Sequence, residues 1–306
     1  MSGLDRISLR PVRVGCRGIE HRRLSVIGHC VVREIRIGTQ GWNYEDWVGA
    51  FYPRSAKAAD FFDLYARVFD TVEIDSTFYA IPAEASIVAW RRRAPQGFVY
   101  ALKLPQEITH LQRLCDCEGV LERFCERARG LEEKLGAVLI QLPPDFSPRS
   151  WGALERFIPL LPSGMRFAVE FRDDSWLGEE FCERTLSLLN AHGVALALVD
   201  SKWIPREVSI RLAERMRARS AADFSYVRWM GPRVLTEFSR IQIDRDRETA
   251  EWAAAFEILR GGVGTIYGYF NNHYQGHSPG SANLFKRLIG QAVVDPESLV
   301  EQPSLF

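Results

Sequence analysis

Charged and amide side chains stand at the ends of short apolar runs along most of the chain. They are Glu73, Asp75, Lys103, Gln141, Glu170, Arg172, Asp200, Arg228 and Asn271. Alternate side chains of a strand point to opposite faces, so the apolar neighbours of these residues turn them toward the inside of a sheet. A charge buried there costs several kcal/mol unless it is paired. The pattern predicts a polar pocket with a ligand or reaction, and a buried structural network, such as Glu170 paired with Arg228, is the alternative.

The residue types in this set suit general acid–base catalysis. Carboxylates that face Lys and Arg across one pocket have pKa values pushed apart, which creates an acid and a base near neutral pH. The candidate catalytic residues are Glu170, Glu73, Asp75, Lys103 and Asp200, with Glu170 as the best single candidate. The candidate substrate-binding residues are Trp42, His110, Gln141, Arg172, Arg228, Asn271, Asn272 and His277. The expected substrate is small and polar, phosphorylated and nucleoside-like compounds included, and no cofactor or metal is predicted.

The elements that must position these side chains follow one repeated pattern. From residue 34 onward, a β-branched or aromatic run, a polar loop and an amphipathic helix alternate, which is typical of a parallel sheet. The expected strands are 35–40, 71–76, 98–104, 137–142, 166–172, 195–200, 224–229 and 265–271. Eight such units predict an α/β fold of the TIM (β/α)8 barrel type, whose active site lies at the carboxyl ends of the strands. We expect one barrel domain over residues 34–292.

Composition and charge narrow the class of protein. The 306 residues carry 39 Lys and Arg against 39 Asp and Glu, so the chain lacks the positive charge of a dedicated nucleic-acid binder. No apolar run reaches the roughly 18 residues of a membrane helix, and six Cys fit a cytoplasmic protein with reduced thiols. Residues 1–33, with seven Arg against Asp5 and Glu20, predict a basic disordered extension whose removal leaves the barrel folded. Residues 293–306 are expected to form a C-terminal tail.

Seven motifs lie at or near the expected strand ends. They are GTQGWNYEDWVGAFYP (38–53), VEIDSTFY (72–79), FVYALKLPQEITH (98–110), LIQLPPDF (139–146), EFRDDSW (170–176), YVRWMG (226–231) and YFNNHYQGHSPGSAN (269–283). Together they resemble the YecE-like family, also called domain of unknown function 72, over roughly residues 35–290. The resemblance implies a TIM barrel, in agreement with the strand count, and leaves the biochemical activity open.

Three positions depart from the motifs of that family. Asp75 stands where asparagine is usual, and Asp173 and Met230 each replace a histidine. These departures weaken any mechanism that needs the two imidazoles. His273 and His277 lie just after the last expected strand and can restore some of that capacity.

Other functions remain open at this stage. One is a non-catalytic ligand- or RNA-binding barrel that uses the basic extension for attachment. Another is a metal-dependent repair nuclease, for which His110, His192, His273 and His277 are the barrel histidines. A nucleic-acid partner is therefore an alternative to the favoured small polar substrate. No membrane partner is expected. An anion site is also expected after the last two strands, built from Gly231, Arg233, Asn272 and the helix start after Ser278.

Overall fold

Eight parallel strands close into a barrel in the order of the sequence, from β1 to β8. The structure, a computed structural model, describes residues 34–219 and 221–299. Its strands are β1 (Glu34–Gln40), β2 (Thr71–Ile74), β3 (Val99–Lys103), β4 (Leu135–Gln141), β5 (Phe167–Glu170), β6 (Ala195–Ser201), β7 (Phe224–Gly231) and β8 (Thr265–Phe270). β1 pairs with both β2 and β8, which closes the ring. The predicted TIM barrel is confirmed, and each strand overlaps its expected range.

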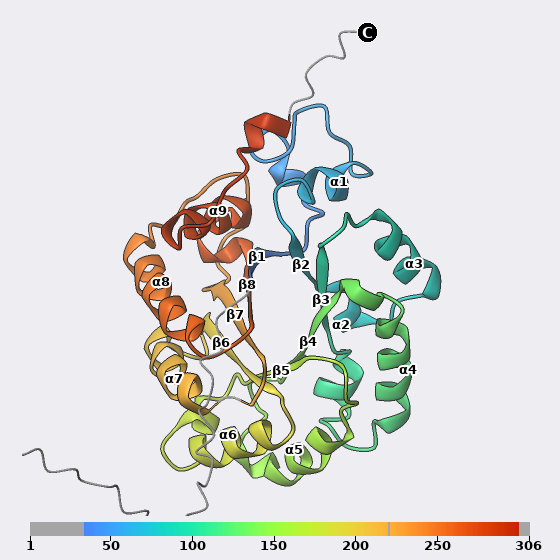
Figure 1. Cartoon of the computed structure of the whole chain (residues 1–306), viewed down its shortest axis with the longest axis vertical. Helices are drawn as coiled ribbons and strands as arrows, with labels where there is room; N and C mark the ends of the chain where they lie inside the picture. Colours follow the sequence, from blue (N-terminus) through green and yellow to red (C-terminus); the bar gives the residue numbers. More distant parts are fainter. Residues whose placement is uncertain (1–33, 220, 300–306) are drawn as a thin grey trace, which may run out of the picture.

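Helices surround the strands on the outside of the barrel (Figure 1). They are α1 (Phe61–Tyr65), α2 (Ser76–Tyr79), α3 (Glu84–Arg93), α4 (Glu118–Arg129), α5 (Trp151–Phe157), α6 (Cys182–Ala191), α7 (Arg206–Arg219), α8 (Asp246–Arg260) and α9 (Ser278–Leu288). Shorter turns are η1 (Glu45–Trp47), η3 (Glu132–Lys134), η4 (Pro148–Ser150), η5 (Ile158–Leu160), η6 (Asp174–Leu177), η7 (Asn272–Tyr274), η8 (Pro296–Leu299) and the π-helical η2 (Glu107–Leu111). α4 buries Val120, Phe124 and Ala128, because apolar residues four apart share one helix face.

The two halves of the barrel fill its interior unequally. β3 to β6 turn small side chains inward, and β7 and β8 turn large aromatic ones inward. The small residues are Ala101, Ala137, Ala168, Ala195 and Ala197, and the large ones include Tyr226, Tyr267 and Tyr269. The tyrosine rings occupy the volume that the alanines leave, since protein interiors are closely packed. The barrel interior around these residues is therefore filled by side chains.

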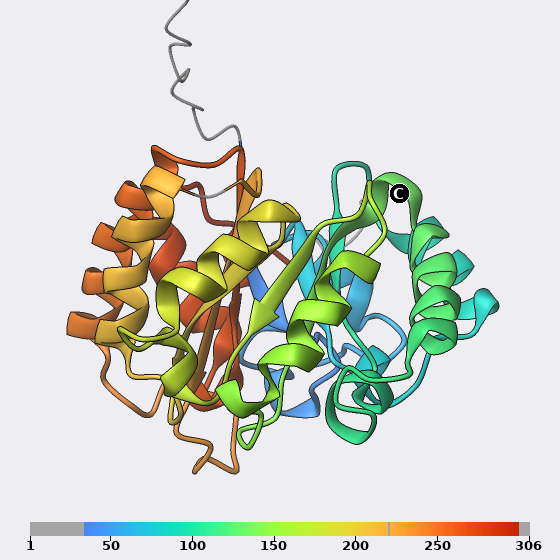
Figure 2. The same cartoon turned by 90° about the horizontal axis from the view of Figure 1, so that it is seen from below.

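The loops that follow the strands gather at one end of the barrel, which we call the mouth. Figure 2 shows the loops after β1, β3 and β7 reaching this end, at the lower edge of the view. The loops after β7 and β8 meet at Gly231, the last residue of β7, which has φ of +65°. A Cβ at Gly231 would lie 2.2 Å from the carbonyl oxygen of His273. The close approach of the loop after β8 therefore requires glycine here.

The two ends of the chain are described unequally. The basic extension expected over residues 1–33 lies outside the described residues. Of the expected C-terminal tail, residues 293–299 are described: they include η8, and Leu299 is buried in the apolar core. Within residues 34–219 and 221–299, none of the helices combines the length and apolarity needed to cross a membrane.

Candidate functional site

A chain of ion pairs crosses the barrel directly beneath the mouth. Nη2 and Nε of Arg228 donate to Oε1 and Oε2 of Glu73 at 2.7 and 2.9 Å. Nη1 of Arg228 donates to Glu170 on the other side. Nε of Arg172 donates to Oε1 of Glu170 at 3.0 Å, and its Nη2 donates to Oε1 of Gln141 at 2.6 Å. Side chains from β2, β4 and β7, with those that end β5, are thereby joined into one network of charge-assisted hydrogen bonds.

The two carboxylates of this network differ in how firmly they hold their charge. Burial opposes the ionisation of Glu170, but the guanidiniums of Arg228 and Arg172 outweigh it and lower the pKa to about 2. Burial raises the pKa of Glu73, Arg228 offsets this only in part, and the carboxylate of Asp75 adds to the rise. Glu170 is therefore a fixed anion at neutral pH and a poor proton acceptor.

The network supports the site from below. Glu73 and Arg228 have no exposed surface, and Glu170 is 2% exposed. A molecule in the mouth cannot touch Glu73 or Arg228. The structure thus contains the buried pairing of Glu170 with Arg228 that the sequence had left as the alternative, and it places Glu170 where it orients Arg172.

Asp75 and Lys103 form a pair that faces the mouth above this network. Nζ of Lys103 lies 3.1 Å from Oδ1 of Asp75, whose side chain is 39% exposed. Thr77 in α2 fixes the backbone of Lys103, because its Oγ1 accepts from the Lys103 N–H and donates to the Lys103 carbonyl, both at 2.9 Å. Nζ also lies 4.5 Å from the centre of the Phe78 ring. These contacts hold a cation and an accessible carboxylate side by side.

His110 joins the same group from the loop after β3. Its ring meets the Phe78 ring edge to face at 5.0 Å, and Nδ1 lies 2.8 Å from Oγ1 of Thr109. Burial lowers the pKa of His110, and the charges of Arg172 and Lys103 lower it further. The imidazole is therefore neutral at pH 7.

The backbone around His110 is unusual. His110 belongs to the π-helical turn η2, a rare geometry that occurs often at functional sites. Shortly after it, Arg113, Leu114 and Asp116 all have positive φ, between 49° and 66°. Non-glycine residues in this region cost about 1–3 kcal/mol each, which surrounding contacts must offset. One such contact is the ion pair between Arg113 and Asp145, at 2.9 Å.

The ends of β1 and β8, beside β2, carry amides. Nδ2 of Asn271 donates to Oε1 of Gln40 at 2.8 Å, and its Oδ1 accepts from the His273 N–H at 2.9 Å. Gln40 also contacts the sulfur of Met230 at 2.9 Å. In the alternative amide orientation, the Gln40 oxygen lies 3.2 Å from Nη2 of Arg228. Asn271 therefore lies beside the network, as its position at the end of β8 predicted.

Asp200 does not face the barrel interior, so the prediction for this residue is wrong. Its Oδ2 accepts from Nε1 of Trp252 in α8 at 3.0 Å, and Asp200 pairs in register with Trp229, which also packs outward. In β6 the inward positions are Ala195 and Ala197, so Asp200 falls on the opposite parity. Burial raises its pKa. Asp200 therefore links α8 to the barrel and points away from the barrel interior.

Asn272 and His277 hold loops together and do not line the mouth. Oδ1 of Asn272 accepts from Nε1 of Trp47 at 3.2 Å and from Oγ of Ser278 at 2.7 Å. Nδ1 of His277 contacts the carbonyl of Phe238 at 2.9 Å. Both residues are buried, and they tie the loops after β1 and β7 to the start of α9.

The start of α9, one part of the expected anion site, is engaged by the same contacts. The Ser278 N–H already donates to Asn272 at 3.0 Å. The loop after β7 covers this helix end, because Gly280 packs beneath Ile241 and Gly276 beneath Arg240 and Gln242. These contacts cover the side of the helix N-terminus that faces the loop after β7.

Trp42 packs toward α1 and not over the mouth. Its ring meets the ring of Phe62 edge to face at 5.2 Å, and its carbonyl accepts from the Tyr52 hydroxyl at 2.6 Å. Tyr44 of the same loop lies nearer the site: burial, together with the charges of Asp75 and Glu73, raises its pKa. The Tyr44 hydroxyl donates to the Gln40 carbonyl at 3.0 Å, which places this residue of the aromatic loop beside the site.

Two aromatic residues near the mouth were not among the sequence candidates. Phe78 separates Lys103 from His110, and Trp203 lies in the loop after β6 with its ring centre 4.1 Å from the Arg172 guanidinium carbon. Phe78 was available from the sequence, because it belongs to the VEIDSTFY motif. Trp203 carried no such signal, since it stands in an irregular loop where no periodicity gives its direction.

Among the described residues, no three His, Cys, Asp or Glu side chains lie close enough together to hold a metal ion. The two histidines four apart after β8 face different neighbours. The His273 ring meets the Phe238 ring at 5.0 Å, whereas Nδ1 of His277 is engaged by a carbonyl.

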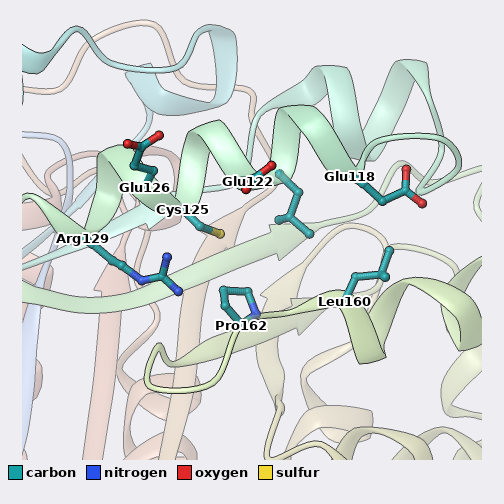
Figure 3. Close-up of a pocket in the computed structure, with 8 residues that line it drawn as sticks. Glu118, Glu122, Cys125, Glu126, Arg129, Leu160 and Pro162 are labelled. Carbon is teal, nitrogen blue, oxygen red and sulfur yellow. The ribbon is translucent and has the colours of Figure 1, made fainter.

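A surface groove of about 570 Å³ lies on the flank of the barrel, away from the mouth. Figure 3 shows Glu118, Glu122 and Glu126 along α4 on one side, with Leu160 and Pro162 on the other. Burial raises the pKa of Cys125, which lines it, to about 11, so the thiol is unreactive at neutral pH. The groove lacks the paired acid and base groups found at the mouth.

The fold and site together define a TIM-barrel protein whose mouth carries paired carboxylate, ammonium, imidazole and guanidinium groups. The chain belongs to the family described as "Protein of unknown function DUF72", whose sequence model matches residues 36–304. The resemblance seen in the seven motifs is thereby confirmed.

Relatives and solved structures agree with this assignment. The UPF0759 protein YecE of Escherichia coli (strain K12) is 30% identical over 190 residues, 60% of this chain and 67% of YecE. The UPF0759 protein YunF of Bacillus subtilis (strain 168) is 29% identical over 177 residues, 56% of this chain and 62% of YunF.

Two crystal structures of DUF72 family proteins share the fold. The Thermotoga maritima protein has a TM-score of 0.70 and 27% identity, covering 84% of this chain and 100% of that one. The Enterococcus faecalis protein has a TM-score of 0.64 and 18% identity, covering 85% and 98%. The latter match supports the fold alone.

Proposed function

We propose that this protein is an enzyme that performs general acid–base chemistry on a small polar substrate bound in the mouth of the barrel. The observation that carries the proposal is the convergence of Asp75, Lys103, His110 and Arg172 at the carboxyl ends of neighbouring strands. Active sites of TIM-barrel enzymes are built at this end. The buried pairs beneath supply rigidity, which catalytic groups need.

His110 is the proton acceptor in this proposal. We assign to His110 the tautomer in which Nδ1–H donates to Oγ1 of Thr109, while Oγ1 donates to the Pro105 carbonyl at 3.4 Å. This tautomer leaves the lone pair on Nε2 free. A lowered pKa keeps that lone pair available at neutral pH, which suits a general base.

The cations complete the proposed chemistry. When Nε2 of His110 removes a proton from an O–H or C–H group of the substrate, negative charge develops on the substrate. The ammonium of Lys103 and the guanidinium of Arg172 are the groups positioned to stabilise it. Glu170 holds Arg172 and Arg228 in place, and Glu73 holds Arg228. In this proposal the two carboxylates position the arginines and do not react with the substrate.

The test is a turnover screen of the full-length protein against sugars, nucleosides and their phosphate esters, read by NMR in D2O. Proton abstraction appears as product formation or as exchange of a substrate C–H for deuterium. For any compound that reacts, His110→Gln should lower the rate at least about 100-fold, the usual contribution of a general base. His192→Gln, at the exposed end of α6, is the matched control and should react as the wild type does.

Two outcomes would contradict the proposal. One is a reaction whose rate His110→Gln leaves intact. The other is a compound that binds in the mouth and never reacts, which would favour the non-catalytic ligand-binding barrel. The pH profile adds a further check: activity should persist below pH 6.5, the ordinary pKa of histidine, because that of His110 is lowered.

A further inference from the structure

Three cations surround the ring of Trp203 at the mouth. The guanidinium carbon of Arg172 lies 4.1 Å from the ring centre, Nζ of Lys202 4.7 Å and the guanidinium carbon of Arg233 5.8 Å. Oγ of Ser201 accepts from the N–H groups of Trp203 and Ile204 at 3.2 and 3.1 Å, which fixes the turn that carries the indole. The loops after β5, β6 and β7 therefore bring three positive charges close to one indole ring.

The charges nearby do not balance this cluster. In the site itself, three carboxylates match three cations: Glu73, Asp75 and Glu170 against Lys103, Arg172 and Arg228. Lys202 and Arg233 form no ion pair with any residue that the structure describes. A cation–π contact is worth about 0.5–1 kcal/mol at an exposed site and leaves the charge in place. Two positive charges therefore remain without an anion.

The positive charge of Arg233 affects the pKa values of Arg172 and His273. Burial lowers the pKa of Arg172; Glu170 counters this, while Arg228 and Arg233 lower it further. Burial and Arg233 also lower the pKa of His273. Moreover, Arg172 is 9% exposed, and its Nη1 has no hydrogen-bond partner in the described part of the chain. A buried guanidinium with a free donor is a fixed point for an incoming acceptor.

We infer that Arg172, Lys202 and Arg233 form, around Trp203, a subsite that binds a phosphate monoester group of the substrate. Such a group carries a charge of about −1.5 to −2 at pH 7, which matches the two unbalanced charges better than a carboxylate does. Arginine forks suit its oxygens, and the indole holds the three cations near one another by cation–π contact. The inference rests on the proposed function, since it names the substrate class of the same mouth.

The position of the subsite fits the proposed chemistry. The charge of Arg172 lowers the pKa of His110, so a phosphate held by Arg172 would lie on the same side of the mouth as the proposed base. The subsite uses the loops after β5, β6 and β7, whereas the start of α9 is covered. Phosphate would thus anchor the substrate while its reacting group lies nearer Lys103 and Asp75.

The experiment is calorimetric titration of the full-length protein with inorganic phosphate, sulfate, phenyl phosphate and benzoate at low ionic strength. Phenyl phosphate should bind at least about tenfold more tightly than benzoate. Lys202→Gln and Arg233→Gln should each weaken phosphate binding about tenfold, as the loss of one charge-assisted contact does. The matched control is Arg240→Gln, an exposed arginine of the same loop as Arg233, which should change binding less than twofold.

The pH dependence separates a dianion subsite from a general attraction to anions. A phosphate monoester loses its second proton near pH 6, so the binding of phenyl phosphate should strengthen from pH 5.5 to 7.5. Sulfate is doubly charged throughout and should not strengthen over this range. Melting temperatures of the variants check that each is folded.

Several results would overturn the inference: equal binding of benzoate and phenyl phosphate, an equal effect of Arg240→Gln, or phosphate binding that Lys202→Gln and Arg233→Gln both leave unchanged. The failure of the proposed function looks different. If phosphate binding follows the two variants and no compound ever reacts, the subsite stands and the enzyme proposal falls. If a compound without phosphate reacts through His110 and these variants have no effect, the subsite falls and the enzyme proposal stands.

Discussion

Replacing Glu170 by glutamine tests whether the ion pairs beneath the mouth stabilise the barrel. The substitution keeps the shape of the side chain and removes its charge. Arg228 then retains Glu73 as its carboxylate partner, and Arg172 retains the Gln141 oxygen. Because Glu170 is 2% exposed, water cannot replace the lost interactions.

Two independent magnitudes agree on the expected cost. Breaking a buried ion pair by removing one partner typically costs about 3–5 kcal/mol. The drop in pKa from 4.5 to about 2 on folding corresponds to about 3 kcal/mol of stability at neutral pH. We therefore expect Glu170→Gln to lower the free energy of unfolding at pH 7 by about 3 kcal/mol.

The depressed pKa of Glu170 also predicts how the difference in stability between wild type and Glu170→Gln changes with pH. A carboxylate whose pKa is depressed by folding stabilises the protein above its unfolded pKa, and this stability is lost as the pH falls through 4.5 toward 2. The gap in stability between wild type and Glu170→Gln should be full above about pH 5 and shrink steadily below it.

The assay is urea unfolding followed by circular dichroism and tryptophan fluorescence, for both proteins, at several pH values from 7 to 3. Glu257→Gln is the control, because Glu257 makes an exposed ion pair with Arg260 and should lose less than about 1 kcal/mol. A loss at Glu170 of similar size to the control would refute the reasoning. So would a larger loss that does not change with pH.

Two further substitutions test other parts of the fold. Gly231→Ala should lower the free energy of unfolding, measured by thermal denaturation, by about 2–4 kcal/mol, because its Cβ meets a backbone carbonyl and its φ is positive. Gly164 also has a positive φ but lies in open space, so Gly164→Ala should cost only about 1–2 kcal/mol. Equal losses would contradict the clash at Gly231. Asp200→Asn should be at least as stable as wild type at pH 7, since the raised pKa of Asp200 means that its contribution is present below the unfolded pKa and is lost as the pH rises through the folded value. A variant less stable than wild type at pH 7, in the same urea assay, would show that the Asp200 charge is favourable.

The barrel could be predicted because its signal is local. Apolar runs followed by amphipathic helices recur eight times, and this periodicity needs no knowledge of distant contacts. The inward direction of Glu73 and Glu170 was also local, because the apolar residues on either side of each clearly occupy the outer face. In β6 both faces are apolar, so the pattern Ala-Leu-Ala-Leu-Val could not fix the parity of Asp200, and the register with β7 decided it.

Which polar residues react and which are structural was decided by the tertiary structure. The partners of Arg228 lie 58 and 155 residues away in the sequence, so neither their pairing nor their complete burial can be derived from spacing. The same holds for Lys202 and Arg233, which meet at Trp203 from two separate loops. The sequence by itself determined the strand order and the types of group at the mouth, since both depend on neighbouring residues. The distances between strands determined which charges are neutralised, because electrostatic energy depends on separation and burial, and only the closed barrel sets these.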